Sequence, residues 1–370
     1  MLERRGLILG ILIASNRLGW IPKEFRLAHE YCFFLHDEVA RMLVEYEAAD
    51  ASTVSLKFES REQGRRFRKL AKKHDTLAAM RELGLHSEAR RVILNQITAA
   101  MTSDCAHHIF ESLRCFEKRK FVPGFNLLRK PLLDSLMYLS WMVADEDGFY
   151  SAFAAGDPTK LTQKLLGNRR REILSSAIAK IGLSDLVSAE ELISAVFDAG
   201  NPYGLYGFFQ HAVHLITVER IEIRTSPENF NFIFKDPSDD GLYETLYMAL
   251  PTALLYLSHV IMALHERVAA PDEGAKAAFA FRTTNMYRCL HHKGYAEAFS
   301  ALMGEILSPR ITCPSCSSPL KVTMHNVPLL LLAESFRCTR CQRRSAFPLS
   351  WAFGQPFSLA ESEEVPTIGA

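Results

Sequence analysis

The sequence lacks a strong net charge, an internal repeat and any long low-complexity tract. Its 43 basic and 42 acidic residues nearly cancel, which leaves a formal net charge of +1 over 370 residues. The molecule as a whole therefore does not attract nucleic acid or membranes electrostatically, and any such role has to come from local patches. Apolar residues make up 48% and charged residues 23% of the chain. This composition is typical of a soluble globular protein with about two or three domains.

Signatures of several enzyme and export classes are also missing. No Glu-x-x-His occurs in the chain, which disfavours a paired di-iron bundle, although residues 104–111 place two carboxylates and two histidines about one helical turn apart. No small-residue cleavage site follows the apolar run at residues 7–14, so we expect no signal peptide. Four of the eight cysteines are scattered through helical segments, which is typical of small buried residues rather than of a secreted disulfide framework. We therefore expect a cytoplasmic protein.

Formal charge is absent from residues 245–264, a stretch that is long enough to cross a membrane. It contains Thr, Pro, Ser, His and Tyr side chains, which favour the central helix of a soluble bundle, buried on nearly all sides. We therefore expect no membrane span.

Helical periodicity dominates the first part of the chain and predicts a mainly α protein, with a multi-helix bundle over residues 1–307. Clusters of Gly and Pro, such as residues 200–204, mark the breaks between helices. Within residues 218–241 apolar and polar residues alternate, which predicts a short extended excursion between two helices. Helices are expected at residues 22–49, 62–83, 87–115, 123–144, 159–180, 189–199, 206–217, 242–269 and 275–307.

The sequence changes character after residue 307, where prolines, paired cysteines and strand-like runs replace the helical pattern. Two Cys-x-x-Cys pairs have 21 residues between them, which is close to the spacing of structural zinc sites with four thiolate ligands. Four thiolates complete a tetrahedral shell, so we expect structural Zn²⁺ rather than a catalytic metal with an open position. The predicted ligands are Cys313, Cys316, Cys338 and Cys341.

Between the two pairs, residues 319–338 are interpreted as two extended runs joined by a turn near His325 and Pro328, and residues 343–353 as a third run. This arrangement resembles a zinc ribbon over residues 308–355. The resemblance implies a small C-terminal β domain that is folded by its metal. Residues 356–370 are expected to form a flexible acidic tail.

One concentration of positive charge lies in the predicted ribbon, where six basic residues face a single acidic one. Zinc with four thiolates contributes about −2, which leaves the module at about +3. The arginines near the second cysteine pair suit phosphate contacts, and the alternative interpretation is that they compensate the anionic metal centre. These residues are Arg337, Arg340, Arg343 and Arg344.

A second concentration lies at residues 61–75, which hold seven Lys and Arg side chains. On a helix, Arg61, Arg65, Arg68 and Lys72 fall on one stripe. Such a stripe attracts the phosphate groups of RNA, of DNA or of an anionic membrane. The alternative interpretation is an ordinary solvated helix face.

Two segments carry a family resemblance: FVPGFNLLRKPLLDSLMYLSWM at residues 121–142 and NPYGLYGFFQHAVHLITVE at residues 201–219. They are similar to an uncharacterised bacterial helical-bundle family that is loosely HEPN-like. The resemblance implies an inward polar cluster of Arg129, Asp134, His211 and His214. Such a cluster is either an RNase-like acid–base site or a polar clasp in the core, since a buried Arg and a buried acid should pair. Similar helical families occur in bacterial defence and toxin systems.

These observations predict an intracellular zinc-containing protein that associates with RNA or DNA, and a bacterial defence effector is one such role. Two alternatives stay open. One is a non-catalytic module that binds a protein partner and uses zinc only for its fold. The other is an RNase-like hydrolase that uses the Arg129 cluster, although no nucleophile or phosphate-binding loop accompanies that cluster, which favours the clasp. The sequence leaves the oligomeric state open.

Overall fold

The computed structural model describes residues 10–49, 54–216, 228, 240–269, 271–349 and 353 of the chain. The protein is mainly α-helical, as predicted, and two short strands lie near its C-terminus. Most of the predicted excursion at residues 218–241 and all of the predicted tail at residues 356–370 lie outside the described residues, so these two expectations stay predictions.

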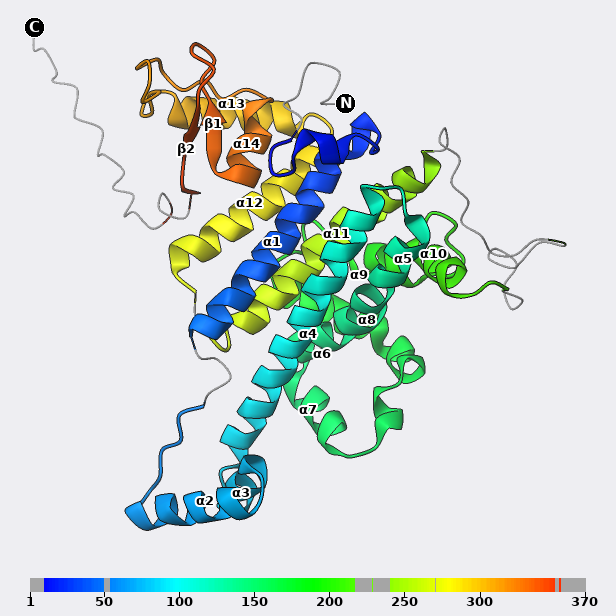
Figure 1. Ribbon diagram of the computed structural model, residues 1–370, viewed down its shortest axis with the longest axis vertical. Coiled ribbons are helices and arrows are strands. Elements are labelled where there is room, and N and C mark those ends of the chain that lie inside the picture. The colour runs from blue at the N-terminus through cyan, green and yellow to red at the C-terminus, as the bar shows by residue number, and fades with distance from the viewer. Residues whose placement is uncertain are drawn as a thin grey trace, which may run out of the picture.

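Three long helices, α1 (Arg26–Ala48), α4 (His86–Phe116) and α11 (Gly241–His265), pack together at the centre of the molecule (Figure 1). The shorter helices surround them, and two segments, Lys130–Ser135 and Ile193–Phe197, are π-helical. The other elements are α2 (Arg61–Lys73), α3 (Thr76–Glu82), α5 (Phe121–Arg129), α6 (Leu136–Ala144), α7 (Glu146–Ala154), α8 (Gln163–Lys180), α9 (Ala189–Leu192), α10 (Leu205–Val213), α12 (Glu273–His291), α13 (Tyr295–Leu307), α14 (Asn326–Ala333), β1 (Ser335–Arg337), β2 (Arg344–Ala346) and 3₁₀ turns at Ser15–Leu18, Lys23–Phe25 and Pro158–Leu161.

Helix α11 is the core helix that the uncharged stretch predicts. It is long and apolar enough to cross a membrane, but 89% of its most apolar window is buried inside the protein. It packs against α1, α4, α6 and α12. A helix that is apolar on all sides is stable in water only when other helices cover it, and here they do.

The predicted helix at residues 62–83 is divided into two helices, α2 and α3, which pack against each other. His74 is extended, and the side chain of Asp75 accepts a hydrogen bond from the N–H of Ala78 at 2.7 Å, which starts α3. At the other end, Ser60 caps α2 through the N–H of Gln63 at 3.1 Å. The resulting hairpin projects from the body at the N-terminal end of α4 (Figure 1).

The prediction of a single helix over residues 275–307 is wrong, because this segment forms two helices, α12 and α13. The break lies at Gly294, whose φ of +81° is left-handed and therefore incompatible with continuation of a right-handed helix.

The expectation of two extended runs between the cysteine pairs is also wrong. Residues Asn326–Ala333 form α14, and the predicted turn at His325 and Pro328 is the start of this helix. Pro328 occupies the first turn, where its missing N–H leaves no helical bond unmade. The strand-like part of this module is the β1–β2 hairpin, together with a single bridge between Thr312 and Pro319.

Helix α14 attaches the C-terminal module to the bundle. Its side chains from Val327 to Leu332 are all buried, and it packs against α12 and α13 as part of the same apolar core. Burial of the four leucines of α14 contributes roughly 6 kcal/mol or more to the free energy of folding, before the entropic cost of ordering this segment is subtracted. The cysteine-containing segments on either side of α14 are therefore held at a fixed place on the bundle.

Arg282 of α12 reinforces this attachment. Its guanidinium group donates to the carbonyl oxygens of Leu331 (2.7 Å) and Leu332 (3.0 Å) near the C-terminal end of α14. It also donates to Glu38 of α1 at 3.1 Å and lies over the ring of Phe34, 4.6 Å from the centroid. Both charged side chains of the Arg282–Glu38 pair are nearly buried, so loss of either one leaves the other with weaker compensation of its charge.

We predict that Arg282→Met lowers the free energy of unfolding by roughly 2–3 kcal/mol, because two carbonyl groups of α14 lose their donor and Glu38 keeps only Arg41 as a cationic partner among the described residues. Urea unfolding followed by circular dichroism measures this change. Arg288→Met, on the same helix, is the matched control: Arg288 lies over Tyr295 at 5.8 Å, a contact worth about 1 kcal/mol or less. Equal effects of the two substitutions would contradict the role given to Arg282.

Candidate metal centre

The two cysteine pairs form two turns with the same backbone geometry. In each turn the N–H of the first cysteine donates to the carbonyl five residues later, which is Ser318 (2.8 Å) in the first turn and Arg343 (2.9 Å) in the second. The residue after the second cysteine has a left-handed φ, 56° at Ser317 and 61° at Gln342. Such a φ costs a non-glycine residue about 1–2 kcal/mol, so the surroundings must hold both turns in place.

The matched turns direct four sulfur atoms to one centre. The Sγ atoms of Cys313, Cys316, Cys338 and Cys341 all lie within 4.8 Å of one another. The Sγ–Sγ distance is 3.6 Å both for Cys313 with Cys341 and for Cys316 with Cys338. A disulfide needs about 2.05 Å, so these cysteines are free thiols.

The sulfur positions fit a four-coordinate metal. A tetrahedral ion with metal–sulfur bonds of about 2.3 Å sets the sulfur–sulfur edges at roughly 3.8 Å, which is close to the two shortest distances here. Two of the cysteines are buried and two are half-buried, so the site is partly shielded from water. The four predicted ligands therefore form a cluster that could hold a metal ion.

Hydrogen-bond donors stabilise negative charge on the sulfur atoms. The backbone N–H groups of Arg340 and Cys341 donate to Cys338 Sγ at 3.4 and 3.5 Å. The Ser318 hydroxyl lies 3.3 Å from Cys316 Sγ, and hydrogen bonds from Ser318 lower the pKa of Cys316 to about 6. This favours the thiolate, which is the form that binds a metal.

The four thiols cannot all ionise without a cation between them. The N–H of Ser315 lowers the pKa of Cys313. At Cys341 the N–H of Arg343 acts in the same direction, but burial and the neighbouring thiols outweigh it and raise the pKa to about 11. A bound dication removes the repulsion among the sulfurs, so metal binding and loss of the remaining protons are coupled.

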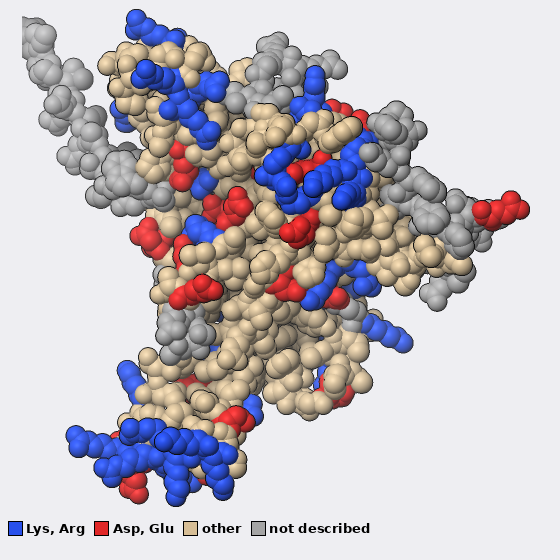
Figure 2. All heavy atoms as spheres, viewed as in Figure 1, with Lys and Arg blue, Asp and Glu red and all other residues tan. Residues whose placement is uncertain are grey.

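The arginines predicted for phosphate contact surround this centre. Arg340, Arg343 and Arg344 are exposed, and Arg337 is half-buried. Arg340 lies beside the metal cluster, 3.5 Å from the Ser318 hydroxyl, and Arg344 donates to Ser335 at 2.8 Å. Figure 2 shows Lys and Arg side chains gathered over this module. None of the four makes an ion pair within the described part of the chain.

The other predicted phosphate-binding residues lie far from the cysteine cluster. Arg61, Arg65, Arg68 and Lys72 are exposed on α2, at one end of the long axis of the molecule, whereas the cysteine module lies at the other end (Figures 1 and 2). The structure therefore divides the predicted nucleic-acid residues into two groups.

The residues of the predicted polar cluster lie on neighbouring elements. Arg129 is the last residue of α5, Asp134 lies in the π-helical segment, and His211 lies on α10, which packs against α5. All three are half-buried, whereas His214 is exposed at the C-terminal end of α10. The acid–base hypothesis and the clasp hypothesis for these residues both stay predictions.

The carboxylates and histidines at residues 104–111 do not form a second metal cluster. Among the described residues, the four cysteines are the only set of three or more His, Cys, Asp or Glu side chains placed to hold an ion. His108 Nδ1 instead lies 2.8 Å from the Asp104 carbonyl, and Asp104 pairs with Lys130 at 2.8 Å.

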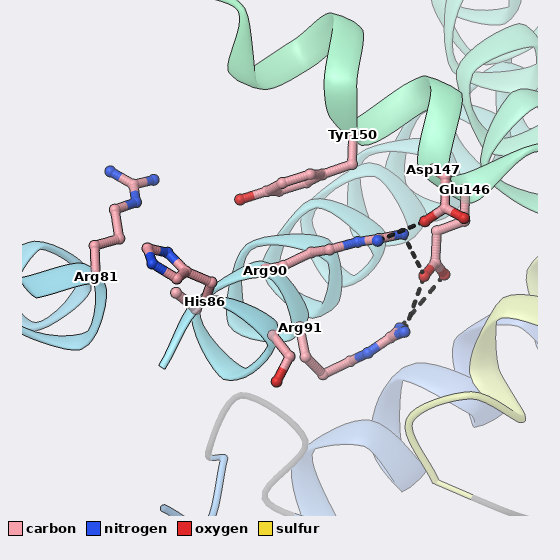
Figure 3. A pocket seen from close by; sticks show the side chains of 9 residues that line it. Arg81, His86, Arg90, Arg91, Glu146, Asp147 and Tyr150 are labelled. Carbon is pink, nitrogen blue, oxygen red and sulfur yellow. Dashed lines mark hydrogen bonds and ion pairs between the residues drawn. The ribbon is translucent and has the colours of Figure 1, made fainter. Parts of the chain in front are cut away.

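A charged hollow of about 680 Å³ between α3, α4 and α7 was not expected from the sequence (Figure 3). Glu146 lies at its edge and accepts hydrogen bonds from Arg90 (3.3 Å), Arg91 (2.9 Å) and Arg267 (2.7 Å). Its partial burial raises its pKa, but the hydrogen bonds and charges of Arg91 and Arg267 outweigh this effect and lower it. The sequence gives no recognisable signal that the adjacent arginines at residues 90–91 pair with Glu146, because this acid lies more than fifty residues away in the chain. Two arginines of this hollow make ion pairs within it: Arg90 with Glu146 and Asp147, and Arg91 with Glu146.

Comparison of the chain with family models, with curated protein sequences and with solved structures finds no match. The resemblance to a helical-bundle family therefore stays a prediction.

We predict that the purified protein binds about one equivalent of a divalent metal and that Cys338→Ser loses it, because three thiolates and a hydroxyl bind far more weakly. Elemental analysis measures the metal content, and circular dichroism checks that the bundle stays helical. Cys115→Ser is the matched control, since Cys115 is a half-buried thiol outside the cluster. Unchanged metal content in the Cys338→Ser protein would show that the cluster is not the metal site.

Proposed function

We propose that this protein associates with nucleic acid through phosphate contacts and that Zn²⁺ holds its C-terminal module in shape. The observation that carries the proposal is helix α2, on which all seven Lys and Arg side chains are exposed. Within the described chain a single ion pair, Arg66 with Glu82 at 3.4 Å, joins one of them to an acidic residue. Exposed cations without acidic partners bind polyphosphate chains by displacing condensed counterions.

The charge around α2 is local and large. Residues 54–85 contain nine Lys or Arg and four Asp or Glu, in a protein whose formal net charge is +1. The stripe of Arg61, Arg65, Arg68 and Lys72 extends for about 16 Å along one side of the helix. A row of cations of this length matches the rise of about five base pairs along the axis of a double helix.

A reducing compartment suits this proposal. All eight cysteines are free thiols, and the four clustered ones bind metal only while they stay reduced. We place the protein in the cytoplasm on this basis. A role as a bacterial defence effector would be compatible with the same contacts and stays a prediction.

Zinc is the metal that best suits four thiolates in a tetrahedral arrangement, and four protein ligands leave no position for a substrate. We therefore expect protein produced with both zinc and iron in the medium to carry zinc. Elemental analysis distinguishes the two metals. A bound iron, visible as sulfur-to-iron charge-transfer absorption, would replace zinc in the proposal without changing its ligands.

We predict that replacing Arg61, Arg65, Arg68 and Lys72 with Gln weakens binding to a double-stranded oligonucleotide by roughly 100-fold at physiological salt. The slope of log Kobs against log salt should fall in magnitude by about 3, because each lost phosphate contact removes about 0.9 from it. Fluorescence anisotropy at several salt concentrations measures both quantities.

The matched control removes the same number of charges elsewhere, by replacing Lys118, Lys120, Lys160 and Lys164 with Gln. These four lysines are exposed and lie outside both basic groups. Equal loss of binding in the two variants would show that only net charge matters. If the unaltered protein does not bind the oligonucleotide at low salt, the proposed function is wrong. The alternative, a non-catalytic module that binds a protein partner, would then be favoured.

A further inference from the structure

We infer that the protein carries two independent phosphate-binding surfaces at opposite ends and joins two separate segments of double-stranded nucleic acid. This inference rests on the proposed function and goes beyond it, since a single surface would suffice for simple association. The first surface, here the α2 surface, consists of Arg61, Arg65, Arg68 and Lys72. The second, here the module surface, consists of Arg340, Arg343 and Arg344.

Both surfaces present cations that the protein itself leaves without acidic partners. Six basic residues and one acidic residue lie between residues 308 and 349, and the acidic residue, Glu334, faces Arg282 at 3.6 Å on the bundle side. Within the described chain none of the seven side chains of the two surfaces makes an ion pair. Their charge is therefore available to an external anion.

The region between the two surfaces is different, because several of its arginines make ion pairs with acids of the same chain, although more than one arginine shares each acid. At the lower part of the body, Glu146 makes ion pairs with Arg90, Arg91 and Arg267. Near the upper part, the buried Glu117 pairs with Arg17 at 2.5 Å, and also with Arg114 at 2.8 Å. Figure 2 shows acidic and basic side chains mixed on the face between the two basic ends. A duplex lying along this face would meet carboxylates among the cations rather than continuous positive charge.

The distance between the surfaces is fixed by rigid elements. Helix α4 has 31 residues and is therefore about 46 Å long, and it separates the α2–α3 hairpin from the end of the body that carries the cysteine module (Figure 1). The module cannot move toward the hairpin while α14 stays buried against α12 and α13. A duplex of about 12 base pairs is roughly 41 Å long and is too short to reach both surfaces.

The chemistry of both surfaces favours a duplex backbone over unpaired bases. Single-strand binding requires exposed aromatic rings on which bases stack. Near α2, Phe58 and Phe67 are half-buried and pack against each other, with 5.4 Å between ring centroids. In the module, Phe336 is buried and Phe347 is half-buried. Within the described residues, neither surface offers an exposed aromatic side chain, so its contacts are limited to phosphate.

The test uses the full-length, metal-loaded protein and two labelled duplexes of about 12 base pairs of unrelated sequence. One duplex is attached to beads and the other is fluorescent, and native mass spectrometry gives the number of duplexes per chain. We expect two duplexes per chain and retention of the fluorescent duplex on the beads only when protein is present. Random-sequence duplexes of DNA and RNA should behave alike, because phosphate contacts carry no base information.

Two variants separate the surfaces: one replaces the four α2 residues with Gln, and the other replaces Arg340, Arg343 and Arg344 with Gln. Each should still bind one duplex, with a weaker salt dependence, and neither should join two duplexes. One duplex per chain in the unaltered protein, or loss of all binding in either variant, would overturn the inference while the proposed function stands. Absence of binding by the unaltered protein would overturn both. Metal content and circular dichroism confirm that each variant is folded.

Discussion

The guanidinium group of Arg282 joins three parts of the chain that are far apart in sequence. Arg282 lies on α12. It donates hydrogen bonds to Glu38 of α1 and to two carbonyl groups of α14. The last carbonyl groups of a helix have no partners within that helix, and a buried carboxylate needs a donor. Arginine is suited to this position because its five N–H donors form a rigid fork that can satisfy several acceptors at once. The place of the cysteine cluster on the bundle depends on this contact and on the burial of α14.

The position of α14 between the two cysteine pairs links metal binding to packing. Eight residues are too few for a helix to be stable in isolation, so α14 owes its stability to the leucines that it buries. A metal ion held by the four thiols would join the chain before α14 to the chain after it and would limit the freedom of this segment in the unfolded state. Part of the free energy of binding that ion would then stabilise the docked helix, and docking holds the thiols close together.

Features set by local sequence could be predicted, and features set by distant contacts could not. The cysteine pairs follow from spacing alone, and the stripe on α2 follows from helical periodicity. The run Val327–Leu332 has no polar residues, so periodicity does not distinguish a buried strand from a buried helix, and the nearby cysteines suggested the wrong choice. The role of Arg282 gives no local signal, because its partner Glu38 lies 244 residues away.

The near-zero net charge of the chain conceals a separation of charge that only the fold makes visible. Many arginines of the body lie next to acids brought close by packing, such as Glu146 of α7, which pairs with Arg91 of α4 and with Arg267 after α11. The hairpin of α2 and α3 and the cysteine module extend beyond the reach of those acids. Their cations therefore stay available to an external anion. Rigid attachment then decides the geometry: α4 holds one basic surface away from the body, and α14 fixes the other at the opposite end, so the two cannot merge into one.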